Sequence, residues 1–219
     1  MKCSLSVLVA AALGCAPFLT GCGSAVIAAK EYMGIPKREQ MVARVEDARN
    51  AQTVAKEQFA SALDEFLAVT KADGGDLEAK YRKLNAEYEA SVKSAKAVSS
   101  RIADVEQVSG KLFAEWQREI GEYTTPSLKA ASQAQLAETK EQYARLLASM
   151  KNAEAKMQPV LATFKDQVMF LKHNLNARAI ASLEGTAGQV SADVERLIKD
   201  MNASIDEANA FIGQLKSAK

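Results

Sequence analysis

Few residues of this chain could carry chemistry. They are Cys3, Cys15 and Cys22, a single histidine, His173, and a lysine at the last position, Lys219. One histidine excludes sites that need several imidazole ligands. The sequence contains no Cys-x-x-Cys, His-Glu-x-x-His or Gly-x-Ser-x-Gly motif. Any chemistry must therefore depend on single side chains and on the segments around them.

The segment before Cys22 is typical of an export signal. No charged residue lies between Lys2 and Lys30, and residues 5–19 are almost entirely apolar. The segment closes on Leu19-Thr20-Gly21-Cys22, an apolar residue and two small ones before the cysteine, which resembles the bacterial lipobox. In that motif the thiol receives a diacylglyceryl group. We therefore predict a lipoprotein signal peptide over 1–21 and a lipidated Cys22, with acyl chains such as palmitate in the membrane.

Three other interpretations of this region stay open. Cys22 could be a buried or free thiol. The uncharged run over 3–29 could remain as a membrane-spanning helix, since it exceeds the roughly 20 residues that a bilayer requires, although Pro17 and several glycines interrupt it. Cys15 also follows a lipobox-like Ala12-Leu13-Gly14, but cleavage there would cut the apolar run short.

Cleavage before Cys22 predicts where the protein resides. The mature chain would keep one cysteine, already acylated, so no disulfide could form within it. The next residue is Gly23 rather than aspartate, which in lipoproteins of proteobacteria is typical of release to the outer membrane. We expect an outer-membrane lipoprotein that faces the periplasm.

His173 and Lys219 suggest weaker alternatives. His173 is the one residue suited to general base catalysis near neutral pH, but no nucleophile motif accompanies it, and we predict that the protein is not an enzyme. A helical lipoprotein that ends in lysine is similar to the Braun-type lipoprotein, whose terminal lysine is joined to peptidoglycan. An even number of antiparallel passes would, however, return Lys219 towards the membrane.

The composition excludes several partners. Lysine and arginine number 28 against 27 aspartates and glutamates, so the chain has no strong field to attract nucleic acid. The one glycine pair, Gly74-Gly75, precedes Asp76 and lacks the residues of a phosphate-binding loop. We predict no nucleic acid, metal or cofactor.

The elements that must position Cys22 are long helices. We expect a lipidated tether over 22–36 that spans at most about 45 Å, followed by a helical coiled-coil domain over 37–219. Apolar residues alternate at steps of four and three, which is a heptad pattern. The seam comprises Met41, Val45, Ala48, Gln52, Ala55, Phe59, Ala62, Phe66 and Val69; Leu77, Tyr81, Leu84, Tyr88, Ser91, Ala95, Val98, Ile102, Val105, Ser109, Leu112 and Trp116; Leu136, Thr139, Tyr143, Leu146, Met150, Ala153, Met157, Val160, Phe164, Gln167 and Leu171; and Val190, Val194, Leu197, Met201, Ser204, Ala208, Phe211 and Leu215.

Glycines and prolines predict the helix boundaries. Asp76 is expected to cap the second helix after Gly74-Gly75, and the segment 121–126 to end it. The third helix is expected over 127–183, with a kink or break at Pro159, and the last helix after a loop flanked by Gly185 and Gly188. Gly110 would mark a close helix crossing. The predicted fold is all-α, an elongated antiparallel coiled coil or helical bundle of about four long helices.

Three segments carry a resemblance to a known family. Residues 31–39 (EYMGIPKRE), 41–49 (MVARVEDAR) and 170–177 (FLKHNLNA) resemble a bacterial family known as domain of unknown function 2959. The similarity extends from about Glu31 to Leu215. Members are exported helical proteins, often lipoproteins, so the resemblance implies an envelope location and a helical fold. It carries no catalytic residues over to this chain.

These observations favour a non-enzymatic periplasmic lipoprotein, anchored in the membrane through its N-terminal lipid, with a coiled-coil body that acts as a scaffold or interaction module. Its partner would be an unknown envelope protein, or a second copy bound through heptad faces. The alternatives are a cell-wall tether through Lys219 and, less favoured, a small-ligand carrier or an enzyme.

Overall fold

The computed structural model describes residues 22–72 and 76–217 and contains five helices over these ranges. No strand occurs in them, which confirms the predicted all-α class. The count is five rather than about four because a short helix precedes the long ones. The helices are α1 Cys22–Tyr32, α2 Lys37–Thr70, α3 Leu77–Glu122, α4 Pro126–His173 and α5 Ala177–Ser217.

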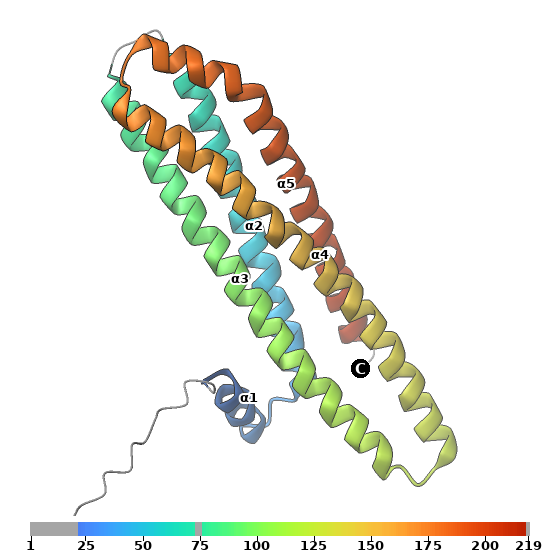
Figure 1. Cartoon of the computed structure of the whole chain (residues 1–219). Coiled ribbons are helices and arrows are strands. Elements are labelled where there is room, and N and C mark those ends of the chain that lie inside the picture. Colours follow the sequence, from blue (N-terminus) through green and yellow to red (C-terminus); the bar gives the residue numbers. More distant parts are fainter. Residues whose placement is uncertain (1–21, 73–75, 218–219) are drawn as a thin grey trace, which may run out of the picture.

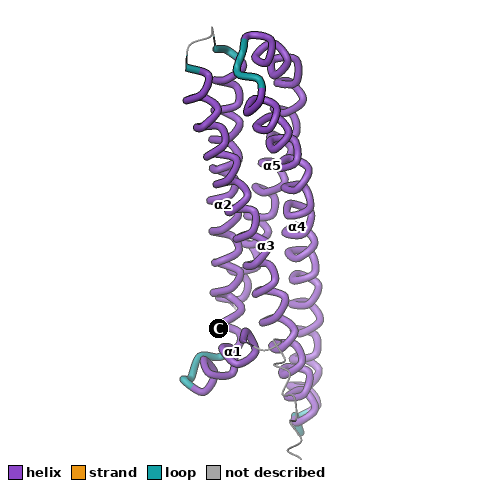
Figure 2. The backbone as a smooth tube through the Cα atoms, turned by 60° about the vertical axis from the view of Figure 1, so that its left-hand side comes forward, coloured by secondary structure: helices purple, strands orange, loops and turns teal. Residues whose placement is uncertain are grey.

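Helices α2 to α5 form an elongated antiparallel bundle (Figure 1). Helix α2 packs against α3 and α5, and α4 packs against the same two helices, so the four helices enclose one core. The α3–α4 hairpin extends past the start of α2 and the end of α5, because α3 and α4 are the longest helices at 46 and 48 residues. Helix α1 lies beside the bundle at this same end (Figure 2).

The seam residues predicted from the heptad pattern form the core. All those of α2 and α5 are buried, as are most of those of α3 and α4. The exceptions are half-buried at the edges of the core: Tyr81, Tyr88, Trp116, Tyr143 and Gln167. The aromatic residues among them lie at the edge because a phenol O–H or an indole N–H is more stable where it reaches water or a hydrogen-bond partner. Trp116 Nε1, for example, donates to Ser132 Oγ at 2.9 Å.

Two predicted boundaries are confirmed. Asp76 caps α3, with its Oδ1 accepting a hydrogen bond from the Ala79 N–H at 2.9 Å. Thr125 has extended backbone (φ −88°, ψ 113°), and Pro126 is the first residue of α4. The proline fits there because its missing N–H would have no partner in a first turn.

The predicted loop at Gly185 and Gly188 is wrong, since both glycines lie inside α5. The chain turns earlier, between His173 and Ala177, where Asn176 Oδ1 accepts from the Ala179 N–H at 3.1 Å. A glycine inside a helix costs about 1 kcal/mol. The apolar residues on the core-facing side of α5 are buried, and the free energy gained by this burial exceeds the cost of the glycines.

Pro159 does not break α4, which runs without interruption from Pro126 to His173. Pro159 and Ala155, whose carbonyl loses its usual donor, both lie on the exposed face of the helix. Water can therefore hydrate that carbonyl, and Val160 and Phe164 remain in the core on the other face. The helix predicted over 127–183 corresponds to α4, which ends at His173 rather than at 183.

Gly110 does not mark a close helix crossing. It is exposed, and a Cβ added to it would meet no atom within 4 Å. We predict that Gly110→Ala raises the free energy of unfolding by about 0.5–1 kcal/mol, because alanine loses less backbone entropy in a helix. Urea denaturation of the parent and variant proteins, followed by circular dichroism, measures this change. A lower stability would indicate that a neighbouring segment does approach Gly110.

One polar pair lies within the core. Ser204 Oγ donates to Gln52 Oε1 at 3.0 Å, and both side chains are fully buried. The other amide atom, Gln52 Nε2, has no hydrogen-bond partner. A buried donor without an acceptor loses its hydration without compensation.

We predict that Gln52→Leu stabilises the bundle by about 1–2 kcal/mol, because it removes this unpaired donor at similar volume. The Ser204 hydroxyl can turn to a carbonyl of its own helix, as Ser91 Oγ does to the Glu87 carbonyl at 2.8 Å. Ser204→Ala is the matched control and should destabilise, since it leaves the whole Gln52 amide unpaired. Thermal unfolding of the three proteins tests this, and a loss of stability in Gln52→Leu would contradict it.

Candidate anchor site and binding groove

The predicted tether over 22–36 is mostly helical. Helix α1 covers Cys22–Tyr32 and ends in a Schellman motif at Gly34. The Gly34 N–H donates to the Glu31 carbonyl at 2.8 Å, and the Ile35 N–H donates to the Lys30 carbonyl at 3.0 Å. Gly34 has φ +81°, a conformation that glycine adopts without steric cost.

Helix α1 is held against the bundle. Ile27 is only 3% exposed, and α1 contacts both α2 and α3. Gln40 Nε2 donates to the carbonyl of Ile27 at 3.2 Å and to that of Ile35 at 3.0 Å. One amide of α2 thus binds both α1 and the segment that follows it.

Charges strengthen this attachment. The Lys37 ammonium pairs with Glu31, and it also pairs with Glu115 of α3 at 2.8 Å. Burial disfavours the ammonium, but the two carboxylates outweigh this effect and raise the pKa of Lys37. The hydrogen bond from Lys37 lowers the pKa of the Glu31 carboxyl below its ordinary 4.5.

The position of α1 decides where an anchor would attach. Cys22 is the first residue of α1, and the predicted signal peptide over 1–21 lies outside the described residues. Exposed apolar side chains follow at the other end of α1, where Tyr32 is 95% and Met33 68% exposed. Within the described ranges, none of the helices combines the length and apolar character needed to span a membrane.

The end of α5 lies at the same end of the bundle as α1 (Figures 1 and 2). Arg38 Nη2 donates to the Leu215 carbonyl at 2.9 Å, and Lys216 pairs with Glu46 at 2.8 Å. These contacts join the start of α2 to the end of α5. Lys219 itself, the site of the alternative wall linkage, lies outside the described residues.

His173 is placed at the opposite end of the bundle. It is the exposed last residue of α4. No cluster of three or more histidine, cysteine or acidic side chains suited to a metal ion occurs in residues 22–72 and 76–217. Among the described residues, no metal-ligand set therefore surrounds His173.

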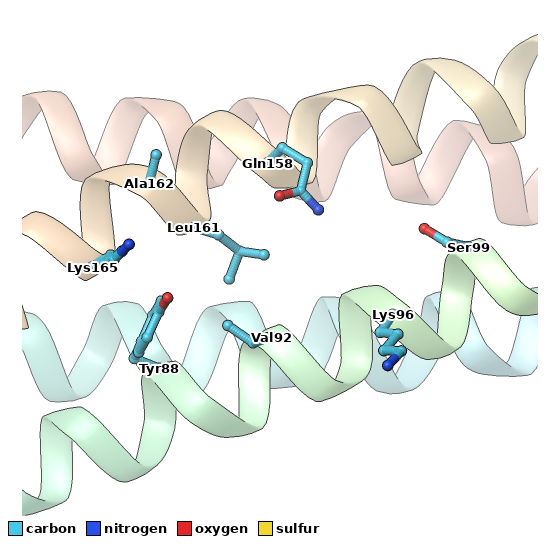
Figure 3. Close-up of a pocket in the computed structure, with 8 residues that line it drawn as sticks. All are labelled: Tyr88, Val92, Lys96, Ser99, Gln158, Leu161, Ala162 and Lys165. Atoms are coloured by element: carbon cyan, nitrogen blue, oxygen red, sulfur yellow. The ribbon is translucent and has the colours of Figure 1, made fainter.

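A groove that sequence reasoning missed runs between α3 and α4, in the half of the bundle away from α1. Its volume is about 500 Å³. Figure 3 shows Leu161 in the middle of the groove, with polar side chains towards each end. The lining residues are Tyr88, Val92, Lys96 and Ser99 of α3 and Gln158, Leu161, Ala162 and Lys165 of α4.

The sequence held one signal for this groove. Tyr88 occupies a seam position, but its phenol is only half-buried and lies at one end of the groove. Lys96 and Lys165 could not be distinguished in the sequence from the other charged residues of the exposed helix faces. Only the packing of α3 against α4 shows which of those charges line the same groove.

The chain matches the family model described as protein of unknown function (DUF2959) over residues 27–215. This match covers most of the sequence, and the chain therefore belongs to that family. The resemblance noted over residues 31–49 and 170–177 is confirmed. No curated protein matches the chain.

We predict that Gln40→Ala releases α1 while the bundle stays folded, because the variant loses both hydrogen bonds to the α1 segment. Hydrogen exchange of the α1 amides should accelerate by ~10-fold, as expected for about 1.4 kcal/mol of lost local stability. The exchange of α3 and α5 should not change. Glu57→Ala, on the exposed face of α2, is the control. Equal exchange in Gln40→Ala and the parent would contradict this role.

Proposed function

We propose that this protein is a non-enzymatic lipoprotein of the bacterial envelope, anchored through Cys22, whose helical body is a scaffold or interaction module in the periplasm. The observation that carries the proposal is the attachment of α1 to the bundle. Because Gln40 and Lys37 bind the segment directly after Cys22, a lipid on that residue would hold one chosen end of the bundle near the membrane.

The orientation that follows has two distinct ends. Helix α1, the start of α2, the end of α5 and the α3–α4 hairpin would lie near the membrane. The α4–α5 turn and the link between α2 and α3 would lie about 50 Å further away, since α2 has 34 residues with a rise of about 1.5 Å each. The exposed Tyr32 and Met33 suit the membrane interface, where amphipathic and apolar side chains are favoured.

The body of the protein supports a binding role over a catalytic one. The seam is filled by packed apolar side chains over almost the whole length of the bundle. We propose that the four helices supercoil as a coiled coil, which the sustained 3.5-residue period favours. Such a body offers long, rigid surfaces rather than an enclosed reaction chamber.

The cell-wall tether through Lys219 is the second candidate, and the contacts of α5 weigh against it. Arg38 and Glu46 hold the end of α5 beside the start of α2. The end of α5 would therefore lie at the membrane-facing end in the proposed orientation. The wall would be reached more easily from the α4–α5 turn.

We predict that Cys22→Ser abolishes acylation, because the hydroxyl cannot replace the thiol in forming the thioether to diacylglycerol. Cells fed an alkyne analogue of palmitate should label the parent protein and not the variant. Cys15→Ser is the matched control and should label like the parent. Inhibition of the lipoprotein signal peptidase should accumulate a precursor longer by the predicted leader. Label retained in Cys22→Ser would overturn the proposal.

A further inference from the structure

The groove between α3 and α4 has an unusual distribution of charge. Lys96 and Lys165 line it, and no carboxylate does. Neither lysine forms an ion pair within the described residues. Four other clefts on the described surface each contain at least one aspartate or glutamate among their lining residues. This groove is therefore cationic, whereas each of those four clefts carries charges of both signs.

Polar side chains lie at the two ends of the groove, and apolar side chains lie between them. Lys165 and Tyr88 lie towards one end, while Lys96, Ser99 and Gln158 lie towards the other (Figure 3). Leu161 is buried at the floor between them, with Val92 opposite. Tyr88 and Lys96 are eight residues apart on α3, so the two cationic ends are separated by about 12 Å, or roughly two helical turns.

The shape of the groove favours a helix over a small molecule. It is open to solvent between two antiparallel helices, so a small ligand would keep much of its surface in water. Small-molecule sites usually bury 70–90% or so of their ligand. A third helix laid along α3 and α4 would cover the apolar floor, in the manner of helix-in-groove recognition.

We propose that this groove binds an acidic amphipathic helix of a partner protein. The bound face would carry aspartate or glutamate at two positions seven or eight residues apart, next to Lys165 and Lys96. Apolar side chains between them would pack on Val92 and Leu161. This inference rests on the proposed interaction role and names the chemistry of the partner.

The test is photocrosslinking in cells that express the full-length protein. A photoreactive phenylalanine derivative at Ala162, an exposed lining residue, is the probe, and the same derivative at the exposed Ala203 of α5 is the control site. We expect a crosslink at Ala162 that exceeds the one at Ala203. Mass spectrometry should map it to a segment of another protein with the predicted spacing of acidic residues.

Charge reversal separates specific binding from proximity. Lys96→Glu combined with Lys165→Glu should lower the Ala162 crosslink by ~10-fold, because like charges would then face each other. Lys172→Glu combined with Lys199→Glu changes the net charge equally on exposed residues outside the groove and should preserve it. Circular dichroism confirms that each variant is folded.

Several outcomes would overturn the inference. They are an Ala162 crosslink no stronger than that at Ala203, one that survives reversal of the groove lysines, and one that maps to lipid, to a second copy of this chain or to a segment without the acidic spacing. Fractionation of the same cells reports the anchor separately. A groove variant that loses the crosslink but stays in the membrane fraction supports the groove, whereas parent protein in the soluble fraction contradicts the proposed anchor alone.

Discussion

Burial of one apolar seam from each of four long helices is the constraint on which this structure depends. An isolated helix is marginal in water, and most of its stability in a protein comes from packing of its apolar face. The seams of α2 to α5 recur at steps of three and four residues, and they can be removed from water together only if the helices lie side by side over most of their length. The elongated shape follows directly from this requirement.

The same constraint explains the features at the two ends of the bundle. Helices α3 and α4 are longer than α2, so their hairpin continues where the four-helix core stops. At that level the core is covered from the side by α1, through Ile27 and the Gln40 amide. We propose that this short helix fixes the orientation of the bundle relative to the membrane. It can do so because it leaves little freedom of movement between a lipid on Cys22 and helix α2.

Much of the fold could be predicted from the sequence because a heptad period reports directly which residues are buried. The Asp76 cap and the extended Thr125 before Pro126 could also be predicted, since each depends only on local chemistry. The turn at Asn174–Asn176 was missed because glycines at 185 and 188 are stronger local signals, and tertiary packing overrides them. Helix α1 was not predicted for a related reason, because its attachment depends on Gln40 and Glu115. Glu115 is distant from α1 in the sequence, and nothing in the sequence distinguishes Gln40 from other polar residues.

Of the two candidate sites, one could be predicted from the sequence and the other could not. Cys22 could be proposed from its neighbours alone, because a processing signal is recognised as a linear segment. The groove could not, because it requires knowing that Lys96 and Lys165, 69 residues apart, lie along the same surface. A balanced charge count conceals such a site, since the total says nothing of which charges share one surface.

The most direct test of the account is the distance of each end of the bundle from the membrane. In the proposed mature chain the one native cysteine, Cys22, would be acylated, so a fluorophore can be attached to a cysteine introduced at Ser127, in the α3–α4 hairpin, or at Lys172, near the α4–α5 turn. In vesicles that carry the acylated protein and a lipid-bound acceptor, energy transfer should be strong from position 127 and weak from position 172. Equal transfer from both positions, or stronger transfer from position 172, would contradict the proposed anchoring of the α1 end.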